Sequence, residues 1–124
     1  MIYVEFSANL RRAFLVLTAL LAVIISVKSL MPALPTLSIS NIDKVAHTLA
    51  YLALGAAVLP AFPRVKPFIV WCYLCAFGVC IEITQGLLDT GRTADFLDSV
   101  ANAGGATLAV AGWIVLTLFA KKLT

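Results

Sequence analysis

Charged residues are scarce in this chain of 124 residues. They make up 12% of it, whereas about a quarter of the residues of a soluble domain are usually charged. Hydrophobic residues make up 62%, and the mean hydropathy is +1.04. A soluble fold of this size would lack the polar exterior that it needs, so we expect lipid to be the main solvent. Because a spanning helix needs about 20 mainly apolar residues, the chain has room for four spans with short connections.

Two further shortages exclude other classes of protein. The formal net charge is only +3, and no basic stripe with interleaved aromatic residues is present, which excludes nucleic-acid binding. The chain has one histidine and three cysteines, and all the cysteines (Cys72, Cys75 and Cys80) fall in one apolar run. Without a second cysteine pair they do not make a zinc motif. We interpret them as small packing residues, and we expect no cofactor.

The apolar runs predict an all-α fold, an integral membrane bundle of four transmembrane helices in a single domain, residues 1–124. The expected spans are residues 12–30, 44–62, 67–88 and 94–120. The first run could instead be a signal peptide, which has the same basic start and short apolar core. We prefer a retained span, because no clear A-x-A cleavage pattern follows it and Lys28 can reach the interface from its end.

Turn and capping residues indicate where these helices end. Asn41 or Asp43 can cap the second helix, Pro67 suits the first turn of the third, and Thr93 can cap the fourth. The fourth run also carries a row of small residues, Ala101, Gly105 and Ala109. Such a row lets another helix approach closely, so it leaves a dimer open.

The polar residues of this apolar sequence gather near the ends of the spans. Glu82 and Gln85 share a face at the end of the third span, and Asp95, Asp98 and Asn102 share one at the start of the fourth. An intramembrane charge costs roughly 2.5–3.5 kcal/mol on the insertion scale, so such groups are functional candidates. The order of the spans places His47, a turn inside the second, at a similar depth. We predict one polar pocket lined by His47, Glu82, Gln85, Arg92, Asp95, Asp98 and Asn102.

The distribution of basic residues predicts the orientation. With four spans, the two termini share a side with the turn between spans two and three. That side carries six basic residues, Arg11, Arg12, Arg64, Lys66, Lys121 and Lys122, and the other carries three, Lys28, Lys44 and Arg92. By the positive-inside rule both termini are expected in the cytoplasm, which places the polar pocket at the outer face.

Four short motifs follow one another within residues 41–112: D-K-x-x-H from Asp43, E-x-x-Q from Glu82, R-x-x-D-x-x-D from Arg92 and N-x-x-G from Asn102. Each is weak alone, but the ordered combination resembles the VanZ-like family of small bacterial polytopic membrane proteins. That family is named for a protein associated with resistance to the glycopeptide teicoplanin. The resemblance therefore implies the bacterial inner membrane and cell envelope as the context, and it implies no particular reaction.

Three functions fit these residues. In the first, the pocket recognises a lipid-linked or cell-wall precursor group, whose phosphate or carboxylate is held by Arg92, Lys44 and a protonated His47. The acidic side chains would position these cations or accept bonds from sugar hydroxyls. The excess of acids argues against a purely anion-binding pocket.

The second function is an enzyme acting on such a lipid. His47 would be the general acid or base, because its pKa is close to neutral, oriented by Asp43 or Glu82. Alternatively, oxygen ligands from the acidic cluster Glu82, Asp95 and Asp98 could hold a divalent cation. No nucleophilic serine or cysteine motif is evident. The third function is a non-catalytic membrane module or small transporter whose polar network is structural.

Taken together, the sequence favours a VanZ-like envelope protein that binds or processes a lipid-linked or cell-wall precursor group at the outer face of the inner membrane. The candidate catalytic residues are His47, Glu82, Asp95 and Asp98. The candidate ligand-binding residues are Asp43, Lys44, Gln85, Arg92 and Asn102. The expected partners are the lipid bilayer and the precursor, and both the presence of catalysis and the oligomeric state are left open.

Overall fold

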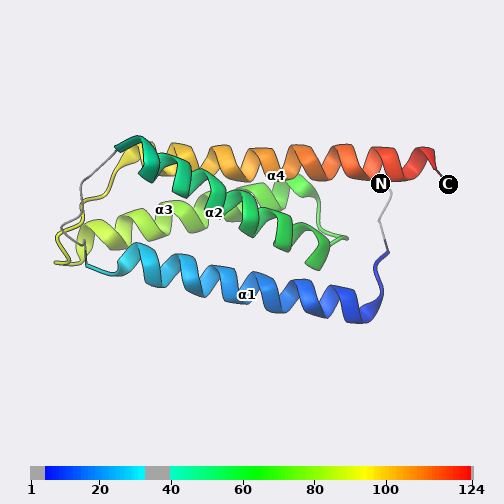
Figure 1. Cartoon of the computed structure of the whole chain (residues 1–124), viewed down its shortest axis with the longest axis horizontal. Helices are drawn as coiled ribbons and strands as arrows, with labels where there is room; N and C mark the ends of the chain where they lie inside the picture. Colours follow the sequence, from blue (N-terminus) through cyan, green and yellow to red (C-terminus); the bar gives the residue numbers. More distant parts are fainter. Residues whose placement is uncertain (1–4, 33–39, 124) are drawn as a thin grey trace.

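The computed structural model of the chain describes residues 5–32 and 40–123. These residues form four helices, α1 (Ala8–Leu30), α2 (Ser40–Ala61), α3 (Pro67–Leu87) and α4 (Phe96–Lys122) (Figure 1). Each of the four is long and apolar enough to cross a membrane. The prediction of an all-α bundle of four membrane helices is therefore confirmed.

The helices run alternately in opposite directions along the long axis of the molecule. The start of α1, the turn from α2 to α3 and the end of α4 lie at one end, and the connection from α3 to α4 lies at the other (Figure 1). We call the second of these the polar end, because the buried polar side chains lie towards it. Helix α2 packs most extensively against α4, while α1 contacts α2 and α3 and, within the described residues, makes no close backbone contact with α4.

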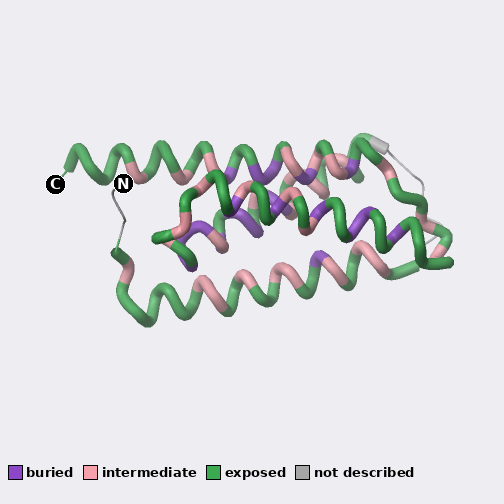
Figure 2. The backbone as a smooth tube through the Cα atoms, turned by 180° about the vertical axis from the view of Figure 1, so that it is seen from behind, coloured by how far each residue is buried: buried purple, intermediate pink, exposed green. Residues whose placement is uncertain are grey.

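Burial is distributed unevenly among the helices. The apolar core lies between α2, α3 and α4 and includes Tyr51, Leu54, Leu74 and Ala106. In α1, by contrast, only Ile25 is buried among residues 8–30 (Figure 2). Helix α1 is therefore the outermost of the four, and most of its surface faces the lipid.

The closest approach between helices is made by glycine. A Cβ atom at residue 105 would overlap the backbone carbonyl oxygen of Thr48, and one at Gly55 would lie 2.5 Å from the Cβ of Ala109. The small residues of α4 thus let its backbone meet that of α2. The row of small residues on α4 that left a dimer open therefore packs against α2 of the same chain. It gives no reason to expect a contact between two copies.

Three helix ends differ from the sequence-based expectation. Helix α1 begins a turn earlier than residue 12, because the Ser7 hydroxyl caps it by accepting a bond from the N–H of Leu10 (3.3 Å). Helix α2 begins at Ser40, so Asn41 and Asp43 lie in its first turn and are not its cap.

Helix α4 begins at Phe96, two residues later than expected. Its cap is Asp95, whose carboxylate accepts from the N–H of Leu97 (2.8 Å). The prediction of a Thr93 cap is wrong. An aspartate is the better cap by side-chain chemistry, since a carboxylate also interacts favourably with the positive end of the helix dipole.

Candidate functional site

Four polar side chains are buried within the described part of the chain: Glu82, Gln85, Asp98 and Asn102. All lie near the polar end, because the last turns of α3 and the first turns of α4 meet there. Helix α2 begins at the same end and brings Asp43, Lys44 and His47 with it. The antiparallel order of the helices thus gathers groups that are far apart in the sequence.

Lys44 joins α2 to the start of α4. Its ammonium group donates to the carboxylate of Asp95 (2.5 Å) and to that of Asp98 at very short range. The side chain of Asp98 is only 8% exposed, and removing one partner of a buried ion pair is strongly destabilising. Asp95 lies outside the spans, and the ammonium of Lys44 together with the N–H of Leu97 holds the pKa of its carboxyl below the ordinary value.

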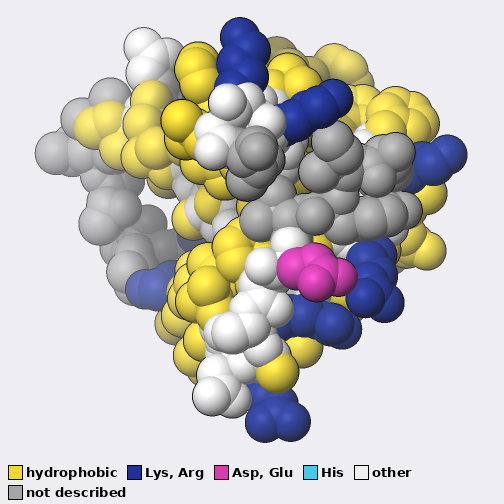
Figure 3. Space-filling model, turned by 90° about the vertical axis from the view of Figure 1, so that its right-hand side faces the viewer, with side chains coloured by type: hydrophobic (Ala, Val, Ile, Leu, Met, Phe, Trp, Pro, Cys, Tyr) yellow, Lys and Arg dark blue, Asp and Glu magenta, His cyan; other side chains and the backbone are white. Residues whose placement is uncertain are grey.

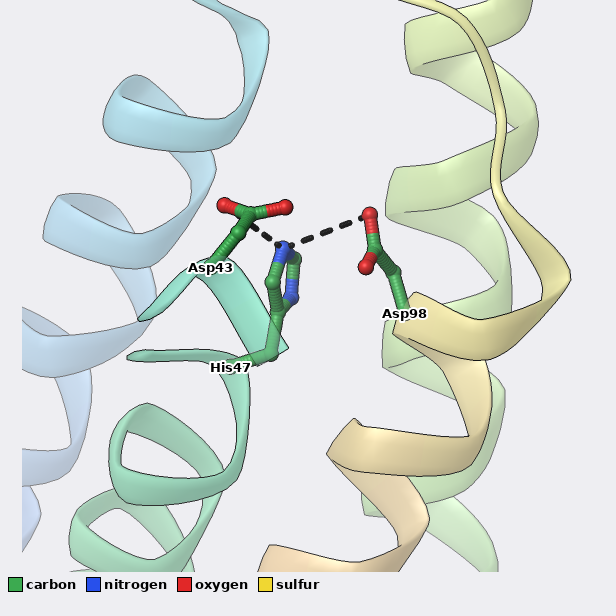
Figure 4. Close-up of side chains that lie close together, drawn as sticks. All are labelled: Asp43, His47 and Asp98. Atoms are coloured by element: carbon green, nitrogen blue, oxygen red, sulfur yellow. Dashed lines mark ion pairs between the residues drawn. The ribbon is translucent and has the colours of Figure 1, made fainter. Parts of the chain in front are cut away.

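His47 lies between two carboxylates and an amide. Its Nδ1 lies 2.9 Å from Oδ1 of Asn102. An amide oxygen only accepts, so Nδ1 carries a hydrogen and donates it. The other ring nitrogen, Nε2, is 3.5 Å from Oδ2 of Asp98 and 4.0 Å from Oδ1 of Asp43 (Figure 4). Asn102 therefore fixes the orientation of the ring and directs Nε2 towards both acids.

Glu82 and Gln85 hold the surrounding elements in place. Glu82 accepts a bond from the backbone N–H of Asp95 (3.1 Å) and so ties the end of α3 to the start of α4. Its second carboxylate oxygen is buried and has no partner among the described residues. The amide of Gln85 donates to the carbonyl oxygen of Ser29 (2.7 Å), which fastens α1 to α3. Gln85 thus serves a contact with α1 and does not join the His47 group.

A pocket of about 280 Å³ lies between α1, α2 and the connection from α3 to α4. Its polar lining comes from Lys28, Asp43, His47 and Arg92, with Ser29 and Tyr51 beside them. Its apolar wall is Ile24, Ile25, Ala46 and Ala50. Of the predicted site residues, Asp43, His47 and Arg92 line this space, whereas Lys44, Glu82, Asp95, Asp98 and Asn102 form the network behind it.

Lys28 was not among the site residues predicted from the sequence, where it marked the end of the first span and entered the charge count for the orientation. The side of the membrane on which Lys28 lies could have identified it. The predicted topology places Lys28 at the end that carries Lys44 and Arg92, so it was a third candidate cation for the same pocket.

The acidic side chains offer one grouping suited to a metal ion within the described residues. One ligand atom each from Asp43, His47 and Asp98 lie within 4.8 Å of one another. The sequence suggested a second grouping, Glu82 with Asp95 and Asp98. A lysine side chain already supplies a positive charge to that grouping. The ammonium of Lys44 contacts both aspartates there and supplies the positive charge that a metal would bring.

Residues 3–119 match the sequence model of the family described as VanZ/LLP1, which extends well beyond the motif region at residues 41–112. No curated protein and no solved structure matches the chain.

Proposed function

The chain belongs to the VanZ/LLP1 family, and on that premise we propose that it binds the polar part of a lipid-linked or cell-wall precursor at the outer face of the bacterial inner membrane. The observation that carries the proposal is the pocket beside α1, which joins an apolar wall to charged side chains. A ligand with an apolar chain and a polar head matches that division. The family context implied by the motifs, glycopeptide resistance, concerns the same envelope.

The charge distribution supports the orientation in this proposal. Figure 3 views the end opposite the polar end, where Lys and Arg side chains predominate over Asp and Glu. The described acid at that end is Glu5, which pairs with Arg64 at 3.9 Å. Basic ends stay in the cytoplasm, so the pocket is assigned to the outer leaflet.

The polar network behind the pocket acts as its support. Lys44, Asp95 and Asp98 pair with one another, and Asn102 orients His47, so these groups hold their geometry without a ligand. Arg92 differs, because it lines the pocket and its Nε is buried without a partner among the described residues. A network that only specified packing would pair this donor, since an unsatisfied buried donor costs roughly 1–3 kcal/mol.

Lipid capture tests this function. The protein and His47→Gln are purified from bacterial membranes in mild detergent, and the lipids that co-purify are identified by mass spectrometry. We expect one class of lipid-linked envelope compound to be enriched with the native protein and reduced about tenfold with His47→Gln, a change of roughly 1.4 kcal/mol in binding free energy.

The control for lipid capture is Thr117→Ala, which removes a hydroxyl bonded within α4 near the opposite end. It should retain the lipid. If the native protein enriches no lipid-linked compound relative to the bulk membrane, the proposed function is wrong. If His47→Gln loses lipid and folded protein together, while Thr117→Ala loses neither, the network is structural.

Catalysis is a second candidate, favoured by the arrangement at His47. Asn102 holds Nδ1 of His47 and leaves Nε2 facing Asp98 and Asp43, and His47 itself lines the pocket. A ring held in this way suits a general acid or base. If the protein is an enzyme, purified lipid-linked precursor incubated with it is converted, and His47→Gln stops conversion while some lipid capture remains. Recovery of the precursor unchanged would exclude this candidate.

A further inference from the structure

We propose that the pocket takes a phosphate group carried on a lipid chain, and that Lys28 and Arg92 hold this phosphate. The inference rests on the proposed function and narrows it to a chemical class of ligand and a pair of cations. It also replaces Lys44, the cation expected from the sequence, with Lys28.

The three cations at the polar end differ in whether an acid already holds them. Lys44 is engaged by two carboxylates. Lys28 and Arg92 line the pocket, and neither forms an ion pair with another described residue. Nε of Arg92 is moreover buried with no acceptor in the described part of the chain. An arginine whose N–H lacks a partner beside a cavity indicates an acceptor that enters the cavity.

The charges of the pocket lining favour an anionic ligand. Lys28 and Arg92 contribute two positive charges to the lining, and Asp43 contributes one negative charge. The lining is therefore net positive even when His47 is neutral. A phosphate monoester carries about −1.5 to −2 at neutral pH and has oxygens for both cations at once, whereas a carboxylate carries a single charge. Arginine also presents its donors in a planar fork that suits phosphate oxygens.

The space beside the cations accepts a phosphate with a chain attached. The pocket, of about 280 Å³, is open on one side, and it has room for a phosphate and the first carbons of its chain. The apolar wall of Ile24, Ile25 and Ala50 lies between α1 and α2, and Ile24 itself is exposed on α1. The chain of the ligand can therefore follow this wall into the bilayer.

The test uses dodecyl phosphate as the probe, with the native protein in nanodiscs of phosphatidylcholine and binding measured by titration calorimetry. Dodecanol and inorganic phosphate are the comparison arms. We expect dodecyl phosphate to bind, dodecanol to show no saturable binding, and inorganic phosphate to bind at least tenfold more weakly. Equal binding of dodecanol would overturn the assignment of phosphate, and equal binding of inorganic phosphate would overturn the requirement for a lipid chain.

The variants Lys28→Gln and Arg92→Gln identify the cations. Each should weaken dodecyl phosphate binding about tenfold or more, the loss expected for one charge-assisted hydrogen bond. Lys28→Arg should restore most of the affinity, which a structural role of Lys28 would not predict. The matched control is Arg12→Gln, an exposed cation on the same helix at the opposite end; it should bind as the native protein does.

Two outcomes separate this inference from the proposed function. If envelope lipids are captured from membranes but Lys28→Gln and Arg92→Gln bind dodecyl phosphate normally, the phosphate assignment falls and the proposed function stands. If the native protein binds no dodecyl phosphate and captures no lipid-linked compound, both fall. Thermal unfolding of each variant shows whether it is folded. If Lys28→Gln does not fold, Lys28→Arg tests the proposal in its place.

Discussion

The three cations at the polar end have similar places in the sequence and different surroundings in the fold. Lys44 is held by Asp95 and Asp98, whereas Lys28 and Arg92 face a cavity. A lysine that is held between two acids sets the distance between helices, and one that faces a cavity is available to a ligand. The sequence indicated that all three lie at one end, but the division between them depends on contacts made only in the fold.

The Lys44 contact predicts a loss of stability when it is removed. Lys44→Met leaves the buried carboxylate of Asp98 without its cation. Breaking a buried ion pair costs about 3–5 kcal/mol, and because the lysine side chain is 28% exposed, solvent screening reduces our expectation to about 1–3 kcal/mol. Thermal or denaturant unfolding in detergent measures the loss.

The double variant Lys44→Met/Asp98→Asn is the control for this effect. It removes the uncompensated charge, so it should be more stable than Lys44→Met alone. Additive losses from the two substitutions would show that the groups do not interact.

The lowered pKa of Asp95 predicts that the stability of the fold depends on pH. Its pKa is lowered, first by the hydrogen bond from Lys44 and then by that from the N–H of Leu97. A carboxyl with a lowered folded-state pKa stabilises the fold above its unfolded-state pKa, about 4, and this contribution is lost as the pH falls through the lowered value. Asp95→Asn keeps a capping side chain and removes the charge. It should unfold at a lower temperature than the native protein at pH 6.

The difference between Asp95→Asn and the native protein should shrink as the pH falls below about 4. Unfolding temperatures measured from pH 3 to pH 6 in one detergent test this. A difference that stays constant down to pH 3 would mean that the charge of Asp95 does not contribute.

At the scale of the helix, the presence of each helix was easier to predict than which of its faces packs against the others. The length and hydropathy of the runs and the prolines near their ends indicated four helices. Each helix is apolar on nearly all sides, since its lipid-facing surface is as apolar as its core-facing surface, so the sequence has little periodicity to show which face packs where. The contacts of Gln85 with α1 and of Gly105 with α2 depend on that rotation and came only from the structure.

The contact of α2 with α4 predicts opposite effects at two neighbouring glycines. Gly105→Ala forces the added methyl group against the carbonyl of Thr48, so it should destabilise the protein by about 1–3 kcal/mol or more. Gly104 has nothing within 4 Å of an added Cβ. Gly104→Ala should therefore stabilise it by roughly 0.5–1 kcal/mol, since glycine is a poor residue in a helix interior.

Thermal unfolding of the two glycine variants under one condition provides the comparison. Each variant is the control of the other, because the substitution is the same and the positions are adjacent. Equal effects at residues 104 and 105 would contradict the close approach of α4 to α2.

At the scale of the whole molecule, the alternation of four helices decides which groups meet. Counting spans from the sequence was enough to bring residues from α2, α3 and α4 to one end, and the structure has them there. The contribution of α1 to the pocket was not foreseen, because its polar residues, Lys28 and Ser29, looked like an ordinary helix end.

The orientation of the molecule gives a prediction from labelling. In a variant whose three cysteines are replaced by serine, Asp89→Cys should react with a membrane-impermeant maleimide added outside intact cells. Lys66→Cys, in the turn between α2 and α3, should react only after the membrane is opened. The reverse pattern would place the pocket in the cytoplasm and would remove the outer leaflet from the proposed function.

The exposure of α1 has a consequence for how binding is measured. Only Ile25 of this helix is buried, and the wall it lends to the pocket adjoins lipid. A ligand dissolved in the bilayer reaches such a wall by lateral diffusion within one leaflet, and its chain never crosses water. Occupancy then follows the mole fraction of the ligand in the membrane. We expect isotherms taken at different total lipid concentrations to coincide when plotted against mole fraction, and to separate when plotted against molarity.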